Sequence, residues 1–312
     1  MKNLSLAFTV STVLSISSLA SAESSSPYAP GAPRPNASAP ERDRAPNPEE
    51  SDHVSAGTRL RGTADIAGRI GPVGAALQAG LVLHHTLEVT PSGADENSYL
   101  EAGVALAATP ASVEPQAHVE YMPARFLVLR GDFSAMRYLG TNYGLLRFDS
   151  ADADFGSDVL SDRRGDEHQG WGMKGGFSVM PRAKLGPVLL RSTLSFTAYR
   201  FDDPGPYVYE AELDTLLAKN DFVLTGRTDV LFELHDGPGA ETLLLGPMLE
   251  SRRSLDSDLS RTRLGASFWY VPAEHWASMQ RPRLYAMAGA NVSDPNRSGE
   301  PFAAMGVGAD FE

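Results

Sequence analysis

The sequence predicts an all-β protein, a transmembrane antiparallel up-and-down β-barrel of about twelve strands, with fourteen as the reserve count. Three observations predict this fold. Apolar residues alternate with polar ones along segment after segment from about residue 59 onward, which is the period of a strand with two unlike faces. Several segments reach ten or more residues, the length that a tilted strand needs to cross a bilayer. The last segment, residues 302–311, keeps the alternation to its end.

The first residues predict an exported protein. Lys2 gives a basic start, residues 4–19 are mainly apolar and small, and residues 20–22 read Ala-Ser-Ala, a cleavage signature. The apolar run is too short and too rich in Ser and Thr to span a bilayer as a helix. We therefore expect residues 1–22 to be a signal peptide.

Residues 23–56 differ in composition from the rest of the chain. Seven prolines fall here among Ser, Ala, Asn and charges of both signs, without apolar periodicity. Such a segment buries too little apolar surface to fold alone. We expect a disordered, Pro-rich periplasmic arm that is dispensable for folding, followed by a barrel over residues 57–312.

The barrel region contains thirteen candidate strands, and their spacing gives no propeller-type repeat. They lie near residues 60–66, 73–83, 100–106, 114–122, 127–135, 171–179, 188–198, 207–213, 222–232, 243–249, 264–270, 284–292 and 303–311. The segment 114–122 is short and contains Pro115, which cannot donate a hydrogen bond to a sheet. We therefore expect this segment to be the one that does not form a barrel strand.

Composition excludes several classes of protein. The net charge of −12 argues against nucleic acid as a partner, because a phosphate backbone requires a basic face. The chain has no Cys, so disulfides and thiolate metal sites are excluded. No motif points to a cofactor, and we expect none. Hydrolase and nucleotide-binding motifs such as G-x-S-x-G, H-E-x-x-H and the Walker pattern are also missing from the sequence.

Aromatic residues gather near the predicted strand ends: Tyr99, Tyr121, Tyr138, Trp171, Tyr199, Tyr207, Tyr209, Trp269, Tyr270 and Phe311. Taken together, the export signal, the amphipathic strands, these aromatic strand ends and the C-terminal strand resemble the bacterial outer-membrane β-barrel (porin-like) superfamily. The likeness covers about residues 58–312, and it departs from the usual pattern in that Phe311 is followed by Glu312. The resemblance implies a place in the outer membrane of a Gram-negative cell, contact with outer-membrane lipid, and insertion by the barrel-assembly machinery. It also implies an even number of strands, both termini in the periplasm, and long loops facing outward.

Charged residues on the polar face of the strands are the candidate lining of a pore. Positively and negatively charged residues are interleaved, so we expect them to pair across the lumen. The sequence leaves open whether the interior is a narrow passage or is filled by these side chains. These residues are Arg130, Asp132, Lys174, Arg191, Glu210, Glu212, Asp214, Arg227, Asp229, Arg261, Arg263 and Arg283.

The longest connection, Leu139 to Gly170, is acidic. Asp149, Asp152, Asp154 and Asp158 offer hard oxygen ligands, so this segment is a candidate Ca²⁺ site, although it lacks the ordered spacing of an EF-hand. A solvated loop is the alternative. If the loop faces outward at the mouth of a pore, its charge favours cations.

The sequence leads to three functional hypotheses. The first is a small passive pore for solutes or ions with a mild cation preference. The second is a non-conducting structural or surface-interaction barrel with an acidic extracellular loop. The third is a barrel enzyme that hydrolyses outer-membrane lipid, which no His and Ser arrangement in the sequence supports, so we expect no enzyme activity.

Overall fold

The computed structural model describes residues 57–71, 74–87, 98–202, 205–236, 242–272 and 280–311. The predicted signal peptide (1–22) and arm (23–56) lie outside these residues. No helix among the described residues has the length and apolar character needed to cross a membrane.

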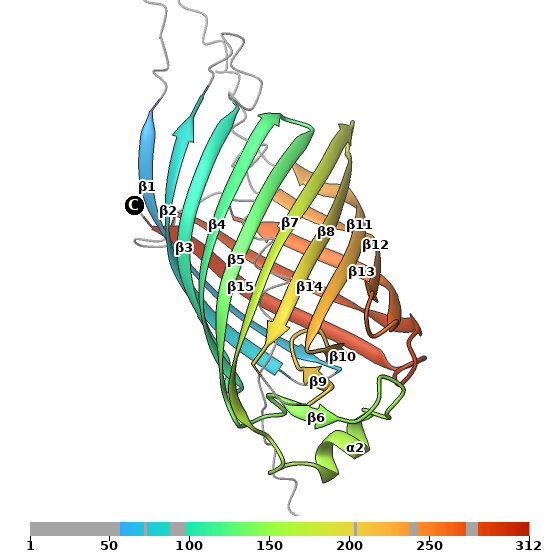
Figure 1. The fold of residues 1–312 in the computed structure, drawn as a ribbon. Helices are drawn as coiled ribbons and strands as arrows, with labels where there is room; N and C mark the ends of the chain where they lie inside the picture. The colour runs from blue at the N-terminus through green and yellow to red at the C-terminus, as the bar shows by residue number, and fades with distance from the viewer. Residues whose placement is uncertain are drawn as a thin grey trace, which may run out of the picture.

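Twelve strands form one closed antiparallel barrel, as the sequence predicts (Figure 1). Around the barrel they follow the order β1-β15-β14-β13-β12-β11-β8-β7-β5-β4-β3-β2. The strands are β1 (Thr58–Ile70), β2 (Gly74–Thr86), β3 (Tyr99–Ala108), β4 (Ser112–Ala124), β5 (Leu127–Leu139), β7 (Gln169–Leu185), β8 (Val188–Phe201), β11 (Asn220–Asp236), β12 (Thr242–Ser254), β13 (Ser260–Val271), β14 (Gln280–Ser293) and β15 (Pro301–Phe311).

The C-terminal strand closes the barrel. β15 pairs with β14 on one side and with β1 on the other, from Gly62 opposite Phe311 to Ile70 opposite Ala303. A closed sheet leaves no unpaired strand edge, and this is a condition for a sheet that crosses a bilayer.

The strand count is right, but two of the thirteen candidates exchange places. The segment 114–122 is a barrel strand, because it lies within β4, which pairs with both β3 and β5. Pro115 is tolerated there: it lies opposite Leu106 of β3, while the ladder to β5 has no pair between Val113 and Gln116. A missing N–H therefore removes little from the sheet.

The candidate at 207–213 is wrong as a barrel strand. Only β9 (Tyr207–Glu210) is extended there, and it lies in a separate three-stranded sheet with β10 (Thr215–Ala218) and β6 (Leu146–Phe148). Both faces of β9 are covered, with Val208, Tyr209 and Glu210 all buried. Alternation identified a strand here without showing which sheet it joins.

The exterior of the barrel is apolar and the interior is charged. Leu60, Leu194 and Met305 on the outward positions are 60% exposed or more, whereas Asp65 and Arg191 on the inward positions are buried. A soluble protein has the reverse distribution. The apolar outer band is that of a transmembrane barrel, whose strands alternate apolar outward and polar inward.

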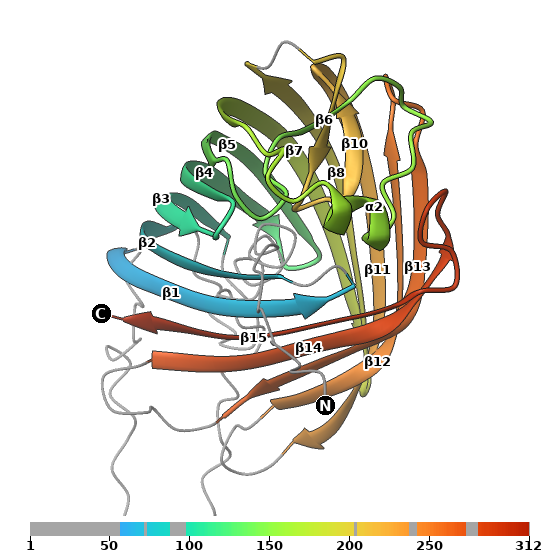
Figure 2. The ribbon, with the colours of Figure 1, turned by 90° about the horizontal axis from the view of Figure 1, so that it is seen from below.

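The two ends of the barrel differ. The terminal end holds the first residue of β1 and the last residue of β15. The opposite end, called the loop end here, carries the long connections 140–168 and 202–219. These two connections contain β6, α2 (Ser157–Asp162), β9 and β10. Figure 2 shows β6, β10 and α2 lying across the loop end, within the ring of strands.

Candidate functional site

The β9–β10 hairpin is the element that closes the loop end. It is inserted between β8 and β11, which are neighbours in the barrel. Its two strands pair from Tyr207 opposite Ala218 to Glu210 opposite Thr215, and the turn between them is the hairpin tip, residues 211–214. Asp214 has a φ of 53°, a left-handed conformation that Asp adopts more readily than most residues.

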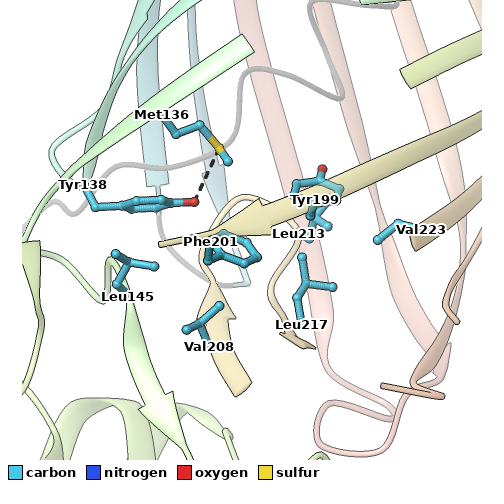
Figure 3. Close-up of a cluster of buried hydrophobic side chains, with 9 residues drawn as sticks. All are labelled: Met136, Tyr138, Leu145, Tyr199, Phe201, Val208, Leu213, Leu217 and Val223. Atoms are coloured by element: carbon cyan, nitrogen blue, oxygen red, sulfur yellow. Dashed lines mark hydrogen bonds between the residues drawn. The ribbon is translucent and has the colours of Figure 1, made fainter. Parts of the chain in front are cut away.

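One face of the hairpin is fixed to the barrel wall by apolar packing. Val208, Leu213 and Leu217 pack against side chains of β5, β8 and β11, and the first and last of these three have no exposed surface (Figure 3). The wall cluster consists of Met136, Tyr138, Leu145, Tyr199, Phe201, Val208, Leu213, Leu217 and Val223. Each large apolar side chain that is fully buried stabilises the folded arrangement by about 1.5–3 kcal/mol.

The other face of the hairpin is covered by the connection 140–168. Leu146, Phe148, Phe155 and Leu160 from this connection pack against Tyr209 and its neighbours on the hairpin. The aromatic rings of Phe155 and Tyr209 lie 6.0 Å apart. The hairpin and its cover therefore form a small folded cap, defined here as residues 140–168 and 205–219, with an apolar core of its own.

Two glycines make room for the wall cluster. β7 points Gly170 and Gly172 into the barrel, where a Cβ atom would lie 2.5 Å from Leu145 Cδ1 and 2.8 Å from Met136 Cε, respectively. A side chain added at Gly170 would collide with Leu145 of the cap, and one added at Gly172 would collide with Met136 of the wall.

The hairpin tip reaches the opposite wall of the barrel. Arg69, near the loop end of β1, donates hydrogen bonds to the backbone carbonyls of Ala211 and Glu212, the second over 3.0 Å. Between β1 and the hairpin's attachment lie β2, β3, β4, β5 and β7 on one side and β12 to β15 on the other. The hairpin therefore crosses the full width of the lumen.

Other cations of the wall converge on the same tip. Lys174 of β7 binds the Glu212 carboxylate, with 2.7 Å between Nζ and Oε2. Arg252 of β12 donates to the Leu213 carbonyl over 2.7 Å, and Arg261 of β13 donates to the Leu213 and Asp214 carbonyls. These contacts come from strands on several sides of the barrel, so the barrel wall binds the tip on more than one side.

Asp214 is the most completely bound residue of the tip. Its carboxylate lies 2.8 Å from Arg297 Nε and 3.1 Å from Arg261, and it accepts a hydrogen bond from Tyr209 Oη over 2.7 Å. Burial alone would raise the pKa of Asp214, but Arg261, Arg297 and Arg69 outweigh burial and hold this pKa below its ordinary value. Asp214 is therefore ionised at neutral pH.

The pKa values of Glu210 and Glu212 are shifted in the opposite direction, upward. Burial raises the pKa of Glu212 to about 7 against the attraction of Lys174, and the nearby carboxylates of Glu114 and Glu210 add to the rise. Burial also raises the pKa of Glu210, whose carboxylate accepts a hydrogen bond from Tyr138. The tip and the adjoining end of β9 therefore combine one firmly ionised carboxylate, Asp214, with two that hold protons more tightly than usual.

The remaining residues predicted to line a pore lie on the barrel wall. Their side chains point inward and bind neighbouring wall residues. Arg227 binds Asp229 of its own strand over 2.9 Å and Ser267 of β13 over 2.9 Å, so its contacts lie within the wall. The other wall contacts join Arg130 to Asp132 and Glu120, Arg191 to Asp229 and the ring of Trp269, Arg263 to Asn291 and Glu250, and Arg283 to Asp65 and Asp310.

Three cations of the site were missed from the sequence. Arg69 and Arg252 fall on the inward-facing positions of their strands, which is a signal that the sequence carries, but they lie near strand ends and not among the mid-strand charges. Arg297 lies in the connection between β14 and β15, where no periodicity marks it, and is 1% exposed. Only the folded arrangement brings it to Asp214.

A cavity of about 140 Å³ lies in the lumen directly under the tip. Glu212 and Leu213 of the tip line it, together with Lys174 and Arg252. The rest of its wall is rich in hydroxyl groups, which come from Ser134, Ser178, Thr193, Ser195, Thr197, Tyr199 and Thr225. The hairpin thus separates a polar interior from the loop end.

The candidate Ca²⁺ ligands do not come together. Asp149, Asp152, Asp154 and Asp158 are exposed, and the Asp154 carboxylate accepts a hydrogen bond from the backbone of Gly156 over 2.7 Å. Among the residues that the structure describes, no three His, Asp or Glu side chains are arranged to hold a metal ion.

Comparisons with known proteins give likenesses in fold. No protein-family model matches the chain, and no curated protein matches its sequence. The β domain of the Bordetella autotransporter BrkA aligns with a TM-score of 0.41 and 12% identity over 83% of this chain and 100% of that one. OmpT, an outer membrane protein of Vibrio cholerae, aligns with a TM-score of 0.32 and 10% identity over 82% of this chain and 99% of that one. LpxR from Salmonella typhimurium aligns with a TM-score of 0.35 and 11% identity over 80% of this chain and 99% of that one.

Proposed function

We propose that the protein is an outer-membrane barrel that forms a gated pore, closed at rest by the β9–β10 hairpin. The outer-membrane location is supported by the predicted export signal and by the apolar exterior of the barrel. A small passive pore, as the sequence predicts, requires a passage. The loop end is occupied by the cap in this structure, so conduction requires the hairpin to move.

The observation that carries this proposal is the contact of Arg69 with the hairpin tip. A loop that merely covered the mouth would touch its own neighbouring strands. This hairpin is attached at β8 and β11 and is bound by the far wall at β1. Its polar contacts are made by Arg and Lys side chains, which can exchange them for contacts with water or ions; each such hydrogen bond to a charged group contributes about 1.5–3 kcal/mol net.

A second candidate is a non-conducting surface-interaction barrel whose acidic loop meets partners outside the cell. The two-sided apolar packing of the hairpin favours it, because that packing would keep the cap folded for long periods. The expectation that the protein does not hydrolyse lipid stays a prediction, which release of fatty acid from membrane lipid would contradict.

The first experiment separates these candidates by planar-bilayer recording of the refolded full-length protein. We expect rare openings in the wild type and frequent ones in Asp214→Lys, because a cation placed between Arg261 and Arg297 repels both. The matched control is Asp158→Lys, which makes the same charge change on an exposed residue of α2. If none of the three proteins conducts although each barrel is folded, the result favours the non-conducting barrel.

A further inference from the structure

Once the hairpin leaves, the wall around its tip carries more cations than anions. Five cations contact the tip: Arg69, Lys174, Arg252, Arg261 and Arg297. The carboxylates that would remain beside them are Glu114 at Lys174, Glu250 at Arg252, Asp294 at Arg261 and Glu300 at Arg297. Glu250 is also shared with Arg263, 3.6 Å away.

Arg69 depends most on the hairpin. Both hydrogen bonds of its guanidinium go to hairpin carbonyls. The hairpin supplies this group of cations with a compact set of oxygen atoms: the carbonyls of residues 211–214 and the carboxylates of Glu212 and Asp214. The tip thus occupies the place that a small anion with several oxygen atoms would take.

We propose that this ring, defined as Arg69, Lys174, Arg252, Arg261 and Arg297, is a binding site for small multivalent oxyanions, and that such anions compete with the hairpin tip for it. The inference rests on the proposed gated pore and names its solute class. Arginine suits the role because its planar, permanently charged group binds carboxylate oxygens with two parallel hydrogen bonds. A ligand that binds only the unplugged ring shifts the gate toward the open state.

The same ring predicts the charge preference of the open pore. Acidic residues of the connection 140–168 favour cations at the mouth, but they are exposed, and salt screens them beyond about 8 Å. The ring lies inside the barrel, on the path that ions would take, so its charges act on them at close range. We therefore expect the open pore to prefer anions, the reverse of what the loop alone predicts.

The test uses a barrel whose hairpin has been removed. Asn220 pairs with Arg200, so β8 and β11 stand side by side where the hairpin leaves, and a short Gly/Ser linker in place of residues 203–218 can join them. Citrate binding to this refolded barrel is measured by calorimetry in detergent, with acetate for comparison. The triple variant Arg69→Gln/Arg252→Gln/Arg261→Gln in the same background removes the ring. The control is Arg59→Gln/Arg164→Gln/Arg253→Gln, which removes three exposed arginines.

We expect citrate to bind the hairpin-free barrel, and the ring variant to bind it about a hundredfold more weakly, because several charge-assisted hydrogen bonds are lost. The control should bind as the parent does. Reversal potentials in a salt gradient should show anion preference that the ring variant loses. Citrate binding no tighter than that of acetate, or binding unchanged by loss of the ring, would overturn the inference. Binding without any conductance would instead overturn the gated pore.

Discussion

Asp214 and Glu212 are two residues apart at the hairpin tip, and they have opposite pH dependence. Asp214 has a lowered pKa, so it stabilises the seated hairpin above its ordinary pKa of 3.8 and loses this effect as the pH falls through its own value. Glu212 has a raised pKa of about 7, so its contribution is complete below 4.5 and is lost as the pH rises through about 7. The hairpin should be seated most firmly between these limits.

At the residue scale, we therefore predict that the pore opens more often at alkaline pH. Between pH 6 and pH 8 Glu212 loses its proton in the seated hairpin, and its contribution to the stability of the closed state falls. We expect the open probability to rise about tenfold over this range. Single-channel recording across this range measures it. Glu212→Gln should remain closed at pH 8, because its side chain stays neutral. An unchanged rise in Glu212→Gln would show that another group is responsible.

The wall residues show how far sequence alone reaches at this scale. Period-two alternation correctly turned Arg191, Arg227 and Asp229 inward, because the two faces of a strand are fixed by the pleat. It could not pair Arg227 with Asp229 or bring Arg297 to Asp214. Those contacts depend on strand register and on the path of a loop, neither of which has a period.

Among the elements, the exchange between residues 114–122 and 207–213 has one cause. Both segments alternate, and a strand needs only two unlike faces to do so. β4 has lipid on one side and the lumen on the other, whereas β9 lies between the barrel wall and the cover formed by residues 140–168. Pro115 does not prevent a barrel strand here, because it is paired in only one of the two neighbouring ladders.

Gly172 provides the element-scale prediction. Gly172→Val should loosen the cap without disrupting the twelve-stranded sheet. The new side chain meets the side chains of Met136, Phe201 and Tyr138, which pack beneath the cap, and no barrel backbone. Such overpacking costs about 1–3 kcal/mol. We expect more frequent openings in bilayers with unchanged heat-modifiable migration on gels.

Gly131→Val is the matched control, since the nearest atom to its new Cβ is 4.0 Å away, at Gly176 O. If Gly172→Val opened no more often than this control, the packing beneath the cap would not hold the hairpin.

For the whole molecule, the prediction concerns the side of the membrane that the cap faces. In barrels of this class both termini lie in the periplasm and the long loops face outward. The loop end is opposite the terminal end, so the cap should lie on the cell surface. An epitope inserted next to the exposed Asp158 should be reached by antibody on intact cells. Labelling only after the outer membrane is breached would reverse the orientation.

The most direct test of the closed lumen is the conductance of the barrel with and without its hairpin. The protein with residues 203–218 replaced by a short linker should give stable open channels in a planar bilayer, while the full-length protein, recorded at pH 6 under the same salt, should stay closed for most of the time. Stable channels of equal size and frequency in both proteins would contradict the account, because the hairpin would then not be the barrier.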